Sequence, residues 1–177
     1  MRNSYNKESE TQWTNGKKNG IKKYFYKSGT LQEEIPYVND KVNGLVKKFY
    51  GEDDSYVRNS NPQIKTIIPY IDDKREGTLK SYYKNGALKQ EDIYKNDKLV
   101  SGKGYRETGH LKYLIEVKKD NQIQTEYDEK GKVWATITNS LNGKIINGIC
   151  GDGRKWTEAE KHNWENGLSV SCSYPTK

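Results

Sequence analysis

The stretch DKREGTLKSYYKNGALKQEDIY, residues 73–94, decides the fold, because related stretches recur along the chain. A lysine recurs near the start of each copy, at Lys17, Lys41, Lys74 and Lys98. The three intervals are 24, 33 and 24 residues, and the longer one is a period plus a nine-residue insertion that we place within residues 51–61. A period of this length indicates a repeat architecture.

Each copy has the pattern of a β-hairpin. Turn-forming pairs such as Asn85-Gly86 separate short segments rich in aromatic and β-branched residues. Neighbours such as Tyr82 and Tyr83 point to opposite faces of a strand, so one aromatic row should face inward and the other outward. A lone hairpin cannot bury its apolar side, and successive copies must therefore stack. We predict an all-β fold: an elongated single twisted antiparallel sheet of stacked β-hairpin repeats, with a short helix in a C-terminal cap.

The 177 residues correspond to one domain, or to one domain with a small appendage. We divide the chain into a flexible polar leader at 1–12, hairpin repeats at 13–148 and a C-terminal cap at 149–177. The insertion at 51–61 is polar and acidic at its start, and it is expected to form a long hairpin loop on one edge of the sheet.

The cap carries helix signals. Thr157 and Glu160 form a capping box, in which the threonine hydroxyl bonds the Glu160 amide and the glutamate carboxylate reaches back. This pattern predicts a helix from about residue 158 to 165, ended by Gly167. Its buried side is expected to hold Trp156, Ala159 and Trp164.

Lysine is spread evenly through the repeats instead of forming a block, and the net charge is +7. Evenly spaced lysines on strands indicate a solvated face with protected edges, or else a basic strip that attracts an acidic partner. Nucleic acid is disfavoured as a partner because arginine is scarce and acidic residues interrupt every repeat. The sequence has no apolar run of 18 residues that could form a membrane span.

The strings YYKNGALKQE and YKNDK, within residues 82–98, resemble the MORN-variant repeat of bacterial proteins grouped as YwqK-type antitoxin components. The resemblance covers roughly residues 15–147 and is strongest at 73–98. It implies a sheet of β-hairpin repeats and a role as the neutralising partner of a toxin. The tail, with Cys150, Cys172 and the segment 163–167 between them, resembles the tails of some exported members of this group.

In an oxidising compartment Cys150 and Cys172 would pair and close a loop of about 23 residues. We therefore expect an exported protein, periplasmic, secreted or lipid-anchored, whose signal has been removed before Met1. Two reduced thiols in a cytoplasmic protein are the alternative. A metal site made from Cys150, His162 and Cys172 would be one ligand short, so no metal is expected.

Catalysis has little support in the sequence. The only histidines are His110 and His162, and neither stands in a recognisable nucleophile setting. Paired acids such as Asp72-Asp73 fall on loops and are expected to be solvated. We therefore expect no enzyme activity and no cofactor.

Binding is the remaining class of function, and rigid aromatic residues contribute most to it. The expected contact residues are Tyr24, Tyr26, Tyr50, Tyr83, Lys23, Lys47 and Lys80. The same tyrosine rows could instead form the core.

The leading hypothesis is an antitoxin or immunity component that binds a protein toxin. The alternatives are an exported envelope or surface scaffold without a toxin partner and, more weakly, a module that binds anionic membrane surfaces. Edge pairing into a homo-oligomer stays open.

Overall fold

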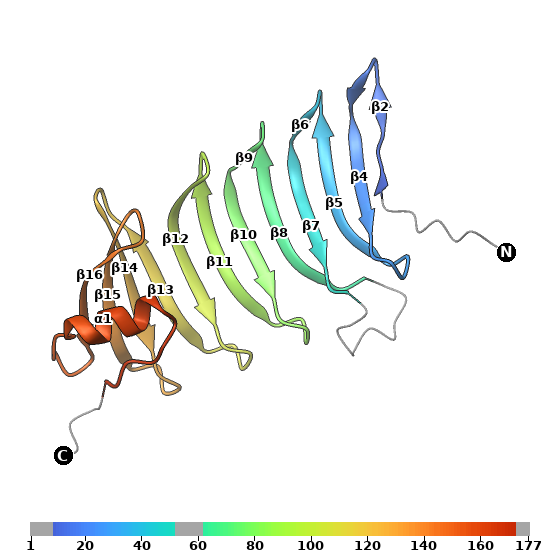
Figure 1. Cartoon of the computed structure of the whole chain (residues 1–177). Helices are drawn as coiled ribbons and strands as arrows, with labels where there is room; N and C mark the ends of the chain where they lie inside the picture. Colours follow the sequence, from blue (N-terminus) through green and yellow to red (C-terminus); the bar gives the residue numbers. More distant parts are fainter. Residues whose placement is uncertain (1–8, 52–61, 173–177) are drawn as a thin grey trace. The chain divides into compact units, whose positions relative to one another are not determined.

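The computed structural model describes residues 9–51 and 62–172 (Figure 1). The chain forms two compact units, residues 1–98 and 99–177, which are described separately below as unit 1 and unit 2. The predicted insertion lies outside the described residues from position 52 onward, as do residues 1–8 of the predicted leader.

Unit 1 is a single layer of antiparallel hairpins. Its strands are β1 (Ser9–Glu10), β2 (Trp13–Thr14), β3 (Lys17–Lys18), β4 (Gly20–Phe25), β5 (Leu31–Val38), β6 (Lys41–Val42), β7 (Gly44–Phe49), β8 (Ile64–Ile71), β9 (Lys74–Arg75), β10 (Gly77–Tyr82) and β11 (Leu88–Lys95). The sheet order is β1-β4-β5-β7-β8-β10-β11, with β6 on β5 and β9 on β8, while β2 and β3 pair separately. Consecutive hairpins therefore lie side by side.

The same irregularity recurs in the three long hairpins of unit 1, which are β4–β5, β7–β8 and β10–β11. In the second of them, Lys48 pairs with Thr66 and Phe49 pairs with Ile64, so Lys65 is an extra residue in β8. The extra residue always belongs to the second strand of the hairpin. The first strand therefore alternates without interruption, and its successive side chains point to opposite faces of the sheet.

Aspartates in the tight turns clamp each hairpin to the preceding one. Asp73 is the second of two central turn residues with positive φ, and its carboxylate accepts a hydrogen bond from the Val42 amide at 2.7 Å. The Asp73 amide in turn donates to the Val42 carbonyl at 2.9 Å. Asp40 repeats both contacts with Lys18, and Asp97 repeats them with Arg75. Asp73 is thus a structural residue and not only a solvated one, which corrects the sequence-based expectation.

Unit 2 contains β12 (Lys98–Tyr105), β13 (Leu111–Val117), β14 (Asn121–Tyr127), β15 (Val133–Ser140), β16 (Ile145–Cys150) and α1 (Glu158–Glu165). The strands pair in chain order, all antiparallel. The core of this unit is small and is made of Ala135, Ile137, Ile145, Cys150, Trp156 and Val170. Figure 1 shows α1 lying against the β14–β16 end of this sheet.

The cap closes the edge of β16. The Trp156 amide donates to the Gly148 carbonyl at 2.8 Å, and the Ile145 amide donates to a Glu165 carboxylate oxygen at 3.2 Å. The Trp156 ring lies directly on Gly148, where an added Cβ would come within 2.2 Å of the indole. An edge strand whose polar groups are already paired cannot template further strands.

The predicted helix and its capping box are confirmed. The Glu160 amide donates to the Thr157 hydroxyl at 3.2 Å, and the Thr157 amide donates to the Glu160 carboxylate at 2.8 Å. Gly167 follows with φ +74°. Trp156 is buried and Trp164 packs on the core, but Ala159 is exposed because it lies on the solvent side of α1. The expectation for Ala159 was therefore wrong.

The predicted all-β chain of antiparallel hairpins, with one short helix in the described part of the C-terminal region, is confirmed. The described end of the predicted leader is structured. Ser9–Glu10 form β1 and pair with β4, and the Asn19 amide donates to the Gln12 carbonyl at 3.1 Å. These residues cover backbone groups of β4 that would otherwise be left at an open edge.

Candidate interaction surface

The three predicted contact lysines lie together on one face of unit 1. Lys23 and Lys47 pair in register with Glu34 from its two sides, and Lys80 pairs with Ile67, the partner of Lys47. Register partners in an antiparallel sheet share a face. We call this side the lysine face of unit 1.

The four predicted contact tyrosines lie on the opposite side. Tyr24 follows Lys23 directly, and alternation places Tyr26, Tyr50 and Tyr83 on the same side as Tyr24. We call this side the tyrosine face of unit 1. The sheet therefore separates the tyrosines from the lysines, and it does not bring the seven residues into one surface.

Two of these tyrosines tie neighbouring hairpins together. The Tyr26 hydroxyl donates to the Phe49 carbonyl at 2.8 Å, and the Tyr50 hydroxyl donates to the Tyr82 carbonyl at 2.6 Å. Both rings are half-buried. Each hydroxyl thus satisfies a main-chain acceptor of the next hairpin, which is a structural task.

Cations lie over the rings of the tyrosine face. The Lys65 and Lys89 ammonium groups are 5.5 and 5.6 Å from the ring centroids of Tyr50 and Tyr83. Both lysines are the extra residues of their hairpins, and the repeat pattern did not indicate this placement. The Lys22 ammonium lies 4.5 Å from the Tyr24 centroid, and its hydrogen bond with Tyr24 raises the pKa of Lys22.

The lysines of the lysine face are paired with glutamates but remain accessible. Glu34 lies between Lys23, at 3.8 Å, and Lys47, at 3.7 Å, while Lys80 is 3.1 Å from Glu91. The three lysine side chains are 39%, 39% and 44% exposed. Exposed pairs of this kind contribute at most about 1 kcal/mol, so a binding partner could compete for these ammonium groups.

An exposed aliphatic stripe crosses the lysine face, and sequence reasoning missed it. It consists of Ile21, Val38, Leu45, Ile71 and Ile93, which are between 43% and 54% exposed. Each lies two or four residues along its strand from a residue of the lysine face, so all five share that face. The hydrophobic residue two positions before Lys23 and Lys47 was a signal that could have revealed it.

Two carboxyl groups are buried among the residues that the structure describes, one in each unit. Asp92 is 5% exposed, and its Oδ2 accepts from Gln90 at 2.6 Å while its Oδ1 has no partner within the described residues. Glu126 accepts from Gln124 at 2.6 Å. Burial raises the pKa of both carboxyl groups above the ordinary range.

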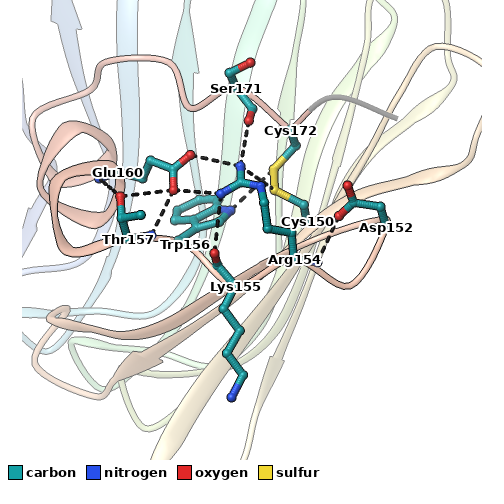
Figure 2. The surroundings of a disulfide bond; sticks show 9 residues. All are labelled: Cys150, Asp152, Arg154, Lys155, Trp156, Thr157, Glu160, Ser171 and Cys172. Carbon is teal, nitrogen blue, oxygen red and sulfur yellow. Dashed lines mark hydrogen bonds and ion pairs between the residues drawn. A yellow bond between two sulfur atoms is a disulfide. The ribbon is translucent and has the colours of Figure 1, made fainter. Parts of the chain in front are cut away.

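The predicted disulfide between Cys150 and Cys172 is present (Figure 2). The Arg154 guanidinium beside it donates to both Glu160 carboxylate oxygens, at 2.9 and 3.0 Å, to the Ser171 carbonyl at 2.8 Å and to the Cys150 sulfur at 3.3 Å. The contact with Arg154, and then the Thr157 amide, lower the pKa of Glu160 to about 2. The bond consumes both cysteines of the metal site considered above and is compatible with an extracellular location.

A surface hollow of about 220 Å³ lies between two hairpin ends of unit 2. It is lined by His110, Leu111, Tyr127, Glu129, Lys130 and Gly131. His110 is exposed, as expected from its place after a turn glycine. Within the described ranges no helix has the length and apolar character needed to cross a bilayer.

Comparison with protein families bears on unit 1. Two segments, residues 18–39 and 75–96, match the MORN repeat variant. The first segment contains β4 and β5 and the second contains β10 and β11, and each ends at the first residue of a clamping turn. Each MORN-variant match is therefore one hairpin, as the sequence resemblance implied. Comparison with curated protein sequences gave no match.

Among solved structures, the chain is similar to a mutant of S. aureus TarM in complex with fondaparinux, alpha-GlcNAc-glycerol and UDP. The identity is 14% over 86% of this chain and 22% of that chain, with a TM-score of 0.20. It is also similar to the GtfA/B complex bound to UDP and GlcNAc, with 9% identity over 90% of this chain and 27% of that one and a TM-score of 0.24. The chain thus spans about a quarter of these structures, and scores this low carry no argument.

Proposed function

We propose that this chain is a non-catalytic repeat module that binds a protein partner. MORN repeats are generally involved in protein or membrane binding. The observation that carries the proposal is the aliphatic stripe on the lysine face of unit 1. Five exposed aliphatic side chains on one face exceed the scattered exposure that is ordinary for a protein surface, and contiguous apolar patches mark interaction sites.

The partner in this proposal is a toxin, and the chain acts as its antitoxin or immunity component. The sequence resemblance to the YwqK-type group supports this role. A rigid sheet of clamped hairpins suits it, since a preorganised surface loses little conformational entropy when it covers another protein. The disulfide is compatible with an encounter outside the cytoplasm, in keeping with the expected export.

The test is co-expression with the product of the neighbouring gene. That product alone should arrest growth of the host, co-expression should restore growth, and the two proteins should elute together in gel filtration. A control in which this chain is replaced by an unrelated exported protein should not restore growth. A neighbouring product that is harmless, or that does not elute with this chain, would contradict the toxin role.

An exported envelope scaffold is the second candidate, and the disulfide is the observation that favours it. In that case the protein that elutes with the chain would be a component of the cell envelope, and deletion of the gene would alter the envelope without releasing a toxic activity. Identification of the bound protein from native cells therefore separates the two roles.

A further inference from the structure

The aliphatic stripe continues across neighbouring strands of unit 1. Ile21 pairs in register with Pro36 and Leu45 pairs with Pro69, and both prolines are only partly buried. Glu34 of β5 pairs in register with Lys47 of β7. Two residues along each of these antiparallel strands, Pro36 therefore faces Leu45. The prolines thus fill the spaces between the aliphatic side chains from Ile21 to Pro69. Thr78, the register partner of Ile93, separates Pro69 from Ile93 in this row.

Lysines border the stripe on both sides. Lys23, Lys47 and Lys80 form the inner border. The outer border is made of Lys41, Lys74 and Lys95, all exposed. Lys41 and Lys74 are the register partners of Val38 and Ile71, which fixes them on the same face. The inner border also carries the carboxylates of Glu34 and Glu91, and Asp72 lies 3.8 Å from Lys41 in the outer border. The six lysines outnumber these three carboxylates, so the surroundings of the stripe have a net positive charge.

We propose that the stripe is the docking surface for a protein whose contact region has an aliphatic centre and a rim of carboxylates. This inference rests on the proposed protein-binding function and assigns it to one face and one kind of partner surface. The aliphatic side chains would be desolvated at the centre of the contact, and the lysine borders would meet the carboxylates of the rim.

The tyrosine face is the weaker candidate for this contact. The hydroxyls of Tyr26 and Tyr50 already donate to the next hairpin, and ammonium groups of unit 1 itself cover the rings of Tyr50 and Tyr83. A partner on that face would have to displace contacts that hold the hairpins together. On the lysine face the five stripe side chains are aliphatic and exposed, so a partner can cover the centre of this face without displacing a polar contact.

A second copy of the chain does not fit the stripe. A two-fold axis that laid one stripe on another would also lay lysine borders on lysine borders, and like charges in a contact are repulsive. An anionic bilayer fits poorly because Glu34 and Glu91 stand in the same row as the lysines and would be pressed against lipid phosphates. A protein surface can place its charges to match this alternation.

Site-specific photo-crosslinking in native cells tests the inference. A benzophenone amino acid replaces Leu45, on the stripe, or Lys48, an exposed residue of the same strand on the tyrosine face. The probe at Leu45 should crosslink one protein, identified by mass spectrometry, and the probe at Lys48 should not. The purified partner should bind the full chain with an affinity that weakens as salt rises.

Variants complete the test. The double change Leu45→Ser and Ile71→Ser should raise the Kd for the purified partner by about tenfold or more, while Lys48→Ser should leave it unchanged. Both variants should keep the wild-type circular dichroism and Tm, which separates lost binding from lost folding.

The outcomes separate the inference from the function on which it rests. Crosslinking of a protein from Lys48 and not from Leu45 would overturn the stripe and leave protein binding in place. Crosslinking from Leu45 to a second copy of the chain would overturn the proposed occupant. The same holds if the Leu45 probe reacts with vesicles that contain phosphatidylglycerol and not with a protein. No protein crosslinked from either position would defeat both the stripe and the proposed function.

Discussion

At the scale of single residues, one carboxyl group interrupts an aliphatic row on the tyrosine face of unit 1. Equivalent positions in the three hairpins hold Ile35, Ile68 and Asp92. Asp92 is buried with an unpartnered oxygen within the described residues, and burial raises its pKa. A buried carboxylate that lacks a full set of partners destabilises a fold.

The change Asp92→Ile should therefore raise the free energy of unfolding by about 1–2 kcal/mol. When the pKa of a carboxyl group is higher in the folded than in the unfolded state, ionisation of the group lowers the stability of the fold. This loss of stability is absent at pH values below the unfolded-state pKa and is complete above the folded-state pKa. The gain in Tm should accordingly be larger at about pH 7 than at about pH 3. The control Ile68→Asp should lower stability, and a D92I protein less stable than the wild type at neutral pH would contradict the argument.

At the scale of the element, the clamping turns join hairpins that could not stand alone. Asp73 and its counterparts Asp40 and Asp97 bind main-chain groups of the preceding hairpin at nearly the same distances. In Asp97 the contact with the Arg75 amide, and then with the Arg75 side chain, lowers the carboxyl pKa. These contacts act between repeats, where stacked arrays obtain most of their stability.

The change Asp73→Gly tests the clamp, because glycine keeps the positive φ of the turn and removes only the carboxylate. Loss of this acceptor leaves the Val42 amide with a poorer partner and should lower the free energy of unfolding by about 1–2 kcal/mol. Asp72→Gly is the matched control, since the contacts of Asp72 within the described residues are a long one of 3.5 Å with Asn43 and one of 3.8 Å with Lys41. If urea denaturation showed that both variants lose the same free energy of unfolding, the result would count against the clamp.

At the scale of the whole molecule, the two units are stabilised differently. Unit 1 depends on repeated contacts between hairpins, whereas unit 2 has a buried cluster and a disulfide between β16 and the tail. The bond joins residues 22 positions apart, for which chain entropy predicts a contribution on the order of 3 kcal/mol. That contribution belongs to unit 2.

Reduction of the disulfide should therefore destabilise unit 2 and leave unit 1 nearly unchanged. Three of the four tryptophans, Trp134, Trp156 and Trp164, belong to unit 2, and the fourth, Trp13, is already 58% exposed in unit 1. The change in tryptophan fluorescence should therefore report mainly the unfolding of unit 2, at a lower urea concentration. Amide exchange in β5 and β8 should stay at its oxidised level. The double variant Cys150→Ser, Cys172→Ser should respond to urea identically with and without reductant, and protection lost throughout β5 and β8 after reduction would argue against separate stabilities.

Much of the fold could be predicted from local chemistry in the sequence. The period of 24 residues and pairs such as Asn85-Gly86 predict hairpins, and the spacing of Thr157 and Glu160 predicts the helix start. The two cysteines left one intramolecular pairing. These features depend on residues close together in the chain, or on a count, and the sequence was therefore sufficient for them.

The faces were decided only by the tertiary structure. The side of a given residue depends on register with another strand and on where the extra residue of a hairpin falls, as Lys65 shows. The same dependence ties the Tyr50 hydroxyl to the next hairpin and aligns Leu45 with Ile71 in the stripe. The separation of Tyr50 from Lys47, by contrast, follows from alternation along a single strand. Pairing between neighbouring hairpins sets the other positions, and the hydrophobic pattern of a single hairpin does not predict that pairing.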